Sequence, residues 1–142
     1  MSQIINMCDI NEDVKTQLQR FRIKKVKETA AIIMKINMEK RELEIEEEIE
    51  NASIEDLAEM IPQRQHRYIG LIFKHPKDDG RITYPLVLIF SSPAGTKMEH
   101  QMMYANTANQ VMSAGGFTIQ FWLADTEDLT TSWLTEQMKL LK

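Results

Sequence analysis

Two segments of almost unbroken apolar character, residues 67–74 and 82–91, constrain the fold more than any other feature of the chain. Each has the length of a β-strand, and together they flank a turn-forming segment at 75–80. A strand without polar alternation is buried on both faces. The sheet that contains these strands must therefore be covered on both sides, and we expect helices to form both layers. Pro85 has no backbone N–H, so we expect a bulge or a sheet edge at that position.

Helical spacing of apolar residues and capping signals predict four helices along the chain. They are expected over residues 10–22, 53–60 and 97–112, and in a last segment that begins near residue 126. Their predicted start signals are Asp9 with Glu12, Ser53 with Asp56, Thr96 with Glu99, and Asp125 or Thr126. Gly115 and Gly116 predict the end of the third helix.

Three further strands are expected. Residues 30–36 are apolar and rich in β-branched side chains, and residues 43–49 alternate apolar with acidic side chains. These two strands predict a hairpin with one wet face, and a fifth strand is expected at 117–123. The element order predicts an α+β fold, in which a mixed β-sheet of about five strands is sandwiched between helices. We expect it to form a single domain over residues 1–142.

Composition excludes several classes of protein. The chain has 142 residues and a single cysteine, Cys8, so an intrachain disulfide cannot form and a reducing compartment is favoured. No apolar run approaches the roughly 20 residues needed to cross a bilayer, and the N-terminus lacks a signal-peptide pattern. The net charge of −4 argues against non-specific nucleic-acid binding. We expect a soluble, cytoplasmic monomer with no membrane span and no nucleic-acid partner.

The sequence shows no arrangement of residues that predicts catalysis. His66, His75 and His100 lack metal-ligand spacing, and no phosphate-binding glycine loop is present. We therefore expect no catalytic residue, no metal and no cofactor, and a protein that is not an enzyme. One alternative stays open: Cys8 precedes the first helix, whose N-terminus could lower the pKa of its thiol and make it redox-reactive.

Two features indicate binding surfaces. The first is a cluster of cations at and after the end of the first helix: Arg20, Arg22, Lys24, Lys25 and Lys27. These cations either complement the C-terminus of that helix or form a patch for an acidic protein or a lipid headgroup.

The second feature is the long helix. Its core face is expected to consist of Met103, Tyr104, Ala108 and Val111. Another face then carries Met98, Gln101, Met102, Ala105, Asn106 and Asn109. Methionines on a helix often fill gaps in a core, but an apolar stripe edged by amides also suits a helix that docks in a partner's hydrophobic cleft.

Several segments resemble the glia maturation factors, a branch of the actin-depolymerising-factor/cofilin family. They are 30–36, 78–81, 84–93, 101–105 and 126–130 with the following Trp133-Leu134. The Met-Tyr-Ala sequence of the long helix is shared with the wider family, whereas the ordered set of segments is specific, and the resemblance covers essentially the whole chain. The family fold that it implies, a mixed sheet between helices, agrees with the element order.

The resemblance also implies a function. Glia maturation factors are understood to bind the actin-related protein 2/3 complex, to inhibit branched nucleation and to dismantle existing branches. We therefore expect a location in the cytoplasm, on the actin cytoskeleton, with the nucleus as an alternative. The partner-binding surface that it implies consists of Ser2, Met98, Gln101, Met102, Ala105, Asn106 and Asn109, with Asp125 nearby. A second contact would use Arg20, Arg22, Lys24 and Lys25, and Ser2 is a candidate phosphorylation site.

The chain departs from the family pattern where cofilins carry basic residues before the Met-x-Tyr-Ala segment. Here those positions are Glu99, His100 and Gln101. We expect weak or absent binding to actin itself, because a reversed charge at a desolvated contact is unfavourable by a few kcal/mol. Ala108 and Gln110 stand where familiar glia maturation factors have lysines, which puts the affinity in doubt. The alternative function is a cofilin-like protein that depolymerises or severs filaments.

Overall fold

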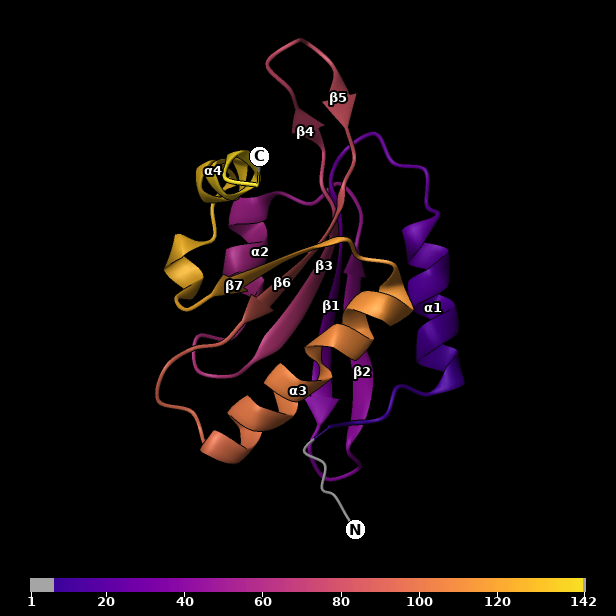
Figure 1. Cartoon of the computed structure of the whole chain (residues 1–142), viewed down its shortest axis with the longest axis vertical. Coiled ribbons are helices and arrows are strands. Elements are labelled where there is room, and N and C mark those ends of the chain that lie inside the picture. Colours follow the sequence, from indigo (N-terminus) through magenta and orange to yellow (C-terminus); the bar gives the residue numbers. More distant parts are fainter. Residues whose placement is uncertain (1–6, 142) are drawn as a thin grey trace.

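The computed structural model describes residues 7–141, which form one five-stranded sheet with helices on both faces (Figure 1). In chain order the elements are α1 (Glu12–Arg22), β1 (Ala30–Asn37), β2 (Glu42–Ile49), α2 (Ile54–Met60), β3 (Arg67–Ile72), β4 (His75–Pro76), β5 (Ile82–Thr83), β6 (Leu86–Ser91), α3 (Met98–Gly115), β7 (Ile119–Leu123), the 3₁₀ turn η1 (Thr126–Asp128) and α4 (Thr131–Lys139).

The sheet is mixed, as the sequence predicts. Its strand order is β2-β1-β3-β6-β7, in which the first three pairings are antiparallel and β7 runs parallel to β6. All six residues of β3, the central strand, are buried. The near-continuous apolar character of this segment therefore reflects a central position with cover on both faces.

Two layers of helices provide this cover. On one face, Leu18 and Phe21 of α1 and Met103 and Tyr104 of α3 pack against the sheet. On the other face the cover comes from α2 and α4, whose buried residues include Leu57 and Leu134. Figure 1 shows α1 and α3 on one side of the strands and α2 on the other. The predicted sandwich is confirmed.

Pro85 divides the predicted strand 82–91 into two. The first part, β5, pairs only with β4 in a small ribbon that projects from the sheet (Figure 1). The second part, β6, begins one residue after Pro85, whose carbonyl oxygen accepts a hydrogen bond from the Phe73 N–H at 3.0 Å. Because proline cannot donate to the ladder, the interruption is a break between two strands rather than a bulge within one.

Three of the predicted helix caps are wrong. At the start of α3 the N-cap position is Lys97 and not Thr96, and no side chain of residues 7–141 caps this helix. The side chain of Asn11, not Asp9, caps α1 by accepting from the Val14 N–H at 3.0 Å. The backbone of Asp9 instead bridges to β2, where the Leu43 N–H donates to the Asp9 carbonyl. Asp125 caps only the turn η1, and α4 begins later, after Thr130. At the starts of α1 and α4, several residues that can form a cap lie within a few positions of each other, and sequence spacing does not show which of them does so.

Candidate functional site

The predicted core face of the long helix is confirmed. Met103, Tyr104, Ala108 and Val111 are each less than 5% exposed. α3 extends three residues beyond the predicted end, and Gly116 terminates it in the left-handed conformation at φ 67°. Glycine adopts this conformation without a Cβ clash, which explains the stop.

The face of α3 opposite the core is largely exposed to solvent. Met98 is 71% exposed and Met102 is 42% exposed, and Ala105, Asn106 and Asn109 are exposed as well, while Gln101 is half-buried. These six positions share one face because they recur at helical spacing. We call this set, Met98, Gln101, Met102, Ala105, Asn106 and Asn109, the α3 face. Large exposed methionines on a well-packed helix are available to a partner, since the core does not use them.

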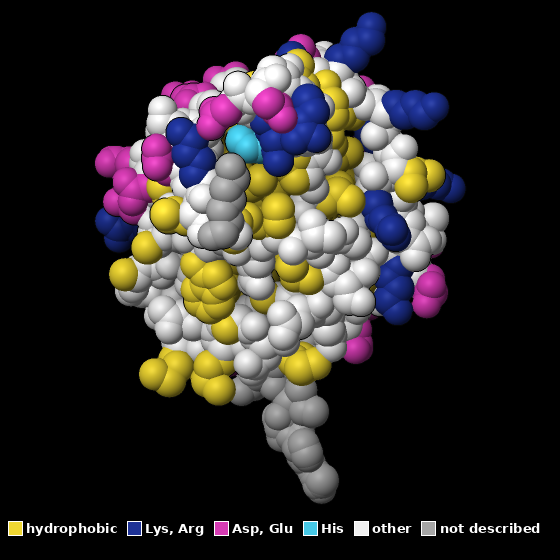
Figure 2. Space-filling model, turned by 45° about the horizontal axis from the view of Figure 1, so that its top comes forward, with side chains coloured by type: hydrophobic (Ala, Val, Ile, Leu, Met, Phe, Trp, Pro, Cys, Tyr) yellow, Lys and Arg dark blue, Asp and Glu magenta, His cyan; other side chains and the backbone are white. Residues whose placement is uncertain are grey.

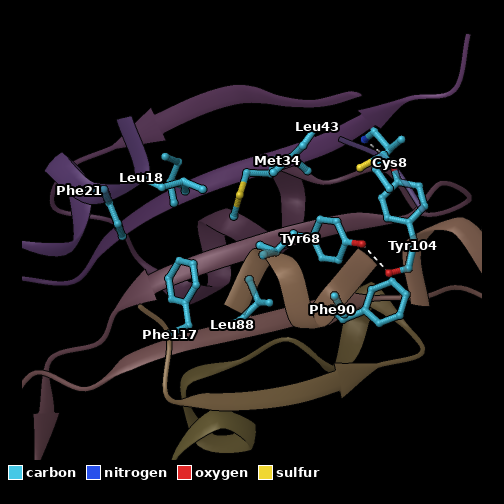
Figure 3. Close-up of a cluster of buried hydrophobic side chains, with 14 of the residues drawn as sticks. Cys8, Leu18, Phe21, Met34, Leu43, Tyr68, Leu88, Phe90, Tyr104 and Phe117 are labelled. Carbon is cyan, nitrogen blue, oxygen red and sulfur yellow. Dashed lines mark hydrogen bonds between the residues drawn. The ribbon is translucent and has the colours of Figure 1, made fainter. Parts of the chain in front are cut away.

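Tyr104 fixes α3 against the sheet. Its hydroxyl accepts a hydrogen bond from the Ile36 N–H at 2.9 Å, and its carbonyl oxygen accepts one from the Tyr68 hydroxyl (Figure 3). Burial raises the pKa of the Tyr104 hydroxyl, so the side chain stays neutral. The tyrosine of the Met-Tyr-Ala sequence is thus an anchor that orients the α3 face.

The N-terminal stretch of the described chain lies beside the middle of α3. The Cys8 N–H donates to Thr107 Oγ1 at 3.1 Å, and this hydroxyl donates in turn to the Met103 carbonyl at 2.7 Å. Cys8 is only 2% exposed, and burial raises the pKa of its thiol. The alternative in which Cys8 is a redox-reactive thiol with a lowered pKa is therefore wrong. Ser2 lies outside the described residues.

Asp125 lies close to the segment that leads into α3. It is exposed and shares a surface hollow with Pro93 and Ala94, which follow β6. Its Oδ1 accepts a hydrogen bond from the Glu127 N–H at 2.9 Å, so the side chain is held in place. The structure thus brings Asp125 towards the Met98 end of the α3 face.

The basic cluster lies at the other end of α3. Arg22 packs over Gly116, since a Cβ added there would lie 2.6 Å from Arg22 Cδ. Basic side chains stand out along the right-hand side of Figure 2, the side on which α1 lies in Figure 1. At 1.5 Å per residue, the length of α3 separates this cluster from Met98 by about 25 Å. The two predicted surfaces are thus distinct, and a partner would contact them separately.

Not all of these cations are equally available. Lys24 Nζ lies 2.6 Å from Glu48 and 3.6 Å from Glu50, and its hydrogen bond with Glu48 raises the pKa of Lys24. Arg20 and Lys25 are exposed, and no ion pair involves them within residues 7–141. One partner, Glu48, belongs to β2, the strand for which the sequence predicts a wet face, and the other, Glu50, directly follows it.

Trp122 is an exposed residue that sequence reasoning missed. It is 60% exposed on the edge strand β7 and lies edge-on to Phe90, at a ring-centroid distance of 4.7 Å. Phe90 also stacks with Tyr104, so Trp122 is on the sheet face that α3 covers. An apolar strand pattern gives no signal for this exposure, because only the sheet order shows that β7 is an edge.

His66 makes stability depend on pH. Burial lowers its pKa, and charge on His100 lowers it further. As the pH falls, the His66 ring is therefore protonated in the unfolded chain before it is protonated in the folded protein. The neutral ring contributes its full share to the free energy of unfolding above about pH 6.5, and this share decreases as the pH falls below that value.

Between about pH 7.5 and 5.5, His66→Gln should lose less unfolding free energy in urea than the wild type. The carboxylates with lowered pKa, Glu46, Glu55 and Asp79, titrate below this window. Equal losses in the two proteins would contradict the assignment.

Within residues 7–141 there is no group of three or more His, Cys, Asp or Glu side chains that could hold a metal ion. No helix of this part of the chain combines the length and apolar character that a membrane crossing requires.

Comparisons with known proteins agree with this architecture. The profile of the family described as cofilin/tropomyosin-type actin-binding protein matches residues 7–139. The chain is similar to glia maturation factor beta from Homo sapiens, with 44% identity over 138 residues and 97% of each chain covered. It is 35% identical over 133 residues to glia maturation factor from Drosophila melanogaster, covering 94% of this chain and 96% of that protein.

Solved structures give the same result. Glia maturation factor from Caenorhabditis elegans matches with a TM-score of 0.83 at 31% identity, over 96% of this chain and 99% of that chain. Cofilin from Streptomyces griseoflavus matches with a TM-score of 0.75 at 17% identity, over 92% and 96% of the respective chains, which is a likeness of fold.

Proposed function

Because the chain belongs to the family of cofilin/tropomyosin-type actin-binding proteins, and within it to the glia maturation factors, we propose that it binds the actin-related protein 2/3 complex. In this proposal it inhibits branched nucleation and promotes the loss of existing branches from actin filaments. The observation that carries the proposal is the exposed α3 face, which a buried tyrosine orients and to which the N-terminal stretch and Asp125 lie close.

The mechanism is a shift of a conformational equilibrium and needs no catalytic group. The exposed methionines of the α3 face enter a hydrophobic cleft of an actin-like subunit, and the amides of Asn106 and Asn109 line its edge. Binding removes a branch only if the protein has a higher affinity for the state of the complex that does not hold the daughter filament.

The charge pattern at the start of α3 favours this function over cofilin-like severing. Glu99 is exposed and His100 is half-buried, at positions where cofilins carry basic residues that meet actin. Sedimentation with bare filaments, compared with pull-down of the purified complex, separates the two functions. We expect retention by the complex and little sedimentation with filaments; the reverse would support the cofilin-like alternative.

The basic cluster should contribute a second, salt-sensitive contact. Arg20→Glu with Lys25→Glu should weaken binding to the complex by roughly ten- to a hundredfold, mainly through slower association, because both cations are exposed and act at long range. The matched control is Lys40→Glu with Lys77→Glu, which makes the same charge change at exposed positions elsewhere. Surface plasmon resonance at two salt concentrations measures the effect. If both variants lost the same affinity for the complex, the effect would come from the change in net charge and not from a contact of the basic cluster.

Ser2 is proposed as a regulatory phosphorylation site. A phosphate adds roughly −1.5 to −2 charges near pH 7 and would oppose docking on an apolar surface. Ser2→Glu should therefore weaken binding to the complex, and Ser2→Gln, which adds no charge, is the control. An unchanged dissociation constant for Ser2→Glu in the same binding assay would eliminate the switch.

A further inference from the structure

The methionines of α3 differ sharply in exposure. Met98 is 71% exposed and Met102 is 42% exposed, whereas the adjacent Met103 is only 1% exposed. Met34 of β1 is also buried, among the side chains that pack on one face of the sheet (Figure 3). Elsewhere within residues 7–141, Met60 is the other exposed methionine, at 41%. The two thioethers of the α3 face are therefore accessible to small solutes that do not reach the buried methionines.

Met98 and Met102 are four residues apart on one helix, so their side chains lie on the same face, about one turn from each other. The buried cluster that contains Met103 and Tyr104 does not include them. A flexible, apolar methionine suits a docking surface, but its sulfur is also readily oxidised. The chemistry that fits the α3 face for docking thus also makes it sensitive to oxidation.

The one cysteine of the chain does not compete for an oxidant. Cys8 is 2% exposed, and burial raises the pKa of its thiol, so the reactive thiolate is scarce. A thioether has no proton to lose before it reacts, so access of the oxidant governs its rate. The exposed methionines are thus the sulfur atoms that an oxidant in solution reaches first.

The reaction with hydrogen peroxide is balanced without any further group. A lone pair of the methionine sulfur attacks one peroxide oxygen, so an S–O bond forms as the O–O bond breaks. The proton of the transferred oxygen passes through solvent to the departing oxygen, which leaves as water. The sulfur is oxidised by two electrons to a sulfoxide, and the peroxide is reduced. A methionine sulfoxide reductase reverses the change with two thiols, which become a disulfide as the oxygen leaves as water.

Oxidation changes the docking surface and leaves the core intact. A sulfoxide is strongly polar, and it loses hydrogen bonds to water when it enters an apolar cleft. The buried side of α3, where the Tyr104 hydroxyl accepts from the Ile36 N–H, is inaccessible to the oxidant. The fold is thus preserved, and the change is confined to what the α3 face binds.

We propose that Met98 and Met102 form a redox-sensitive modification site, at which hydrogen peroxide produces sulfoxides that weaken docking of the α3 face. Reduction of the sulfoxides restores docking, so the modification is a reversible switch. The effect on binding rests on the proposed function, whereas the modification is a property of the free protein and is tested without a partner.

Tandem mass spectrometry, which distinguishes the adjacent Met102 and Met103, tests the modification. The full chain is treated with a limiting amount of hydrogen peroxide, and the sulfoxide content of each methionine is followed with time. Met98 and Met102 should be oxidised about tenfold faster than Met34 and Met103. Met60, whose exposure matches that of Met102, should react at a similar rate to Met102. Equal rates at Met102 and at the buried Met103 would overturn the proposal.

The effect on binding is measured as the ratio of dissociation constants for the actin-related protein 2/3 complex after and before peroxide treatment. For the wild type this ratio should be about ten, and methionine sulfoxide reductases A and B with dithiothreitol should return it towards one. The variant Met98→Leu with Met102→Leu should show a ratio near one, because leucine is apolar and lacks sulfur. The control Met60→Leu should show the same ratio as the wild type.

The outcomes separate the redox switch from the proposed function. If the untreated protein does not bind the complex, the proposed function fails, and the effect of oxidation on binding fails with it. If the untreated protein binds but the wild-type ratio stays near one, or rises equally in the Met98→Leu, Met102→Leu variant, only the redox switch fails. The oxidised protein should keep its cooperative melt in circular dichroism; loss of that melt would show damage to the core and would also overturn the proposal.

Discussion

The double substitution Met102→Asp with Asn106→Asp is expected to weaken binding to the actin-related protein 2/3 complex by at least about a hundredfold. Both side chains are exposed in the free protein, and their replacement would place two carboxylates in a contact that buries apolar surface. A loss of roughly 3 kcal/mol corresponds to this factor. The dissociation constant is measured by pull-down at increasing concentrations of the complex.

The control for this experiment is Met60→Asp with Asn51→Asp. Met60 is 41% exposed, which matches the 42% of Met102, and it ends α2 on the opposite face of the sheet. Both double variants should unfold within about 1 kcal/mol of the wild type, since substitutions at exposed positions are usually mild. If Met102→Asp with Asn106→Asp abolished the cooperative melt followed by circular dichroism, the two residues would belong to the core and the surface assignment would be wrong.

Gly70→Ala is expected to be the most destabilising single-methyl change in the sheet, by about 2–3 kcal/mol. Gly70 lies on β3, and a Cβ at this position would lie 2.4 Å from Phe117 Cζ and 2.9 Å from Ile32 Cγ2. Phe117 cannot move away freely, because its ring also lies over Gly115 at the end of α3, where an added Cβ would approach Phe117 Cε2 to 2.2 Å. Urea unfolding measures the change.

A double-mutant cycle that combines Gly70→Ala with Phe117→Leu provides the control. The smaller side chain at position 117 makes a cavity and destabilises by itself, but it also relieves the clash with the methyl group added at position 70. The double variant should therefore be more stable than the sum of the two single effects predicts, by about 1 kcal/mol or more. Strict additivity would show that Phe117 and Gly70 do not constrain each other.

The fold was predictable because its central strands carry a strong signal. The apolar segments 67–74 and 82–91 cannot alternate between water and core, so a sheet with two helical layers follows from burial alone. The hairpin of β1 and β2 and the core face of α3 also follow from periodicity, and both are confirmed. The prediction was less accurate at Pro85, because the expected single strand 82–91 is divided there into β5 and β6.

What the sequence could not supply are contacts between residues far apart in the chain. Thr96 has the spacing of a helix cap, yet its hydroxyl pairs with His66, thirty positions away. Lys24 looks like a free cation of the basic cluster, yet it pairs with Glu48 across to β2. Local spacing contains no information on such partners, because they depend on how the strands are ordered.

The residues of the candidate site also fall into those that the sequence could predict and those that only the tertiary structure could place. The residues of the α3 face share one exposed side of one helix, so periodicity and the family resemblance were sufficient to identify them. Asp125 and the exposed Trp122 lie on other elements, and only the tertiary structure places Asp125 near the loop before α3 and Trp122 at the sheet edge.

Fluorescence microscopy of preformed branched actin networks tests the central claim most directly. The protein is added at increasing concentrations, with the Met102→Asp, Asn106→Asp variant and its Met60→Asp, Asn51→Asp control in parallel. We predict faster loss of branches with mother filaments intact, abolished in the first variant and preserved in the second. Fragmentation of mother filaments, or branch loss at the same rate with and without the protein, would contradict the account.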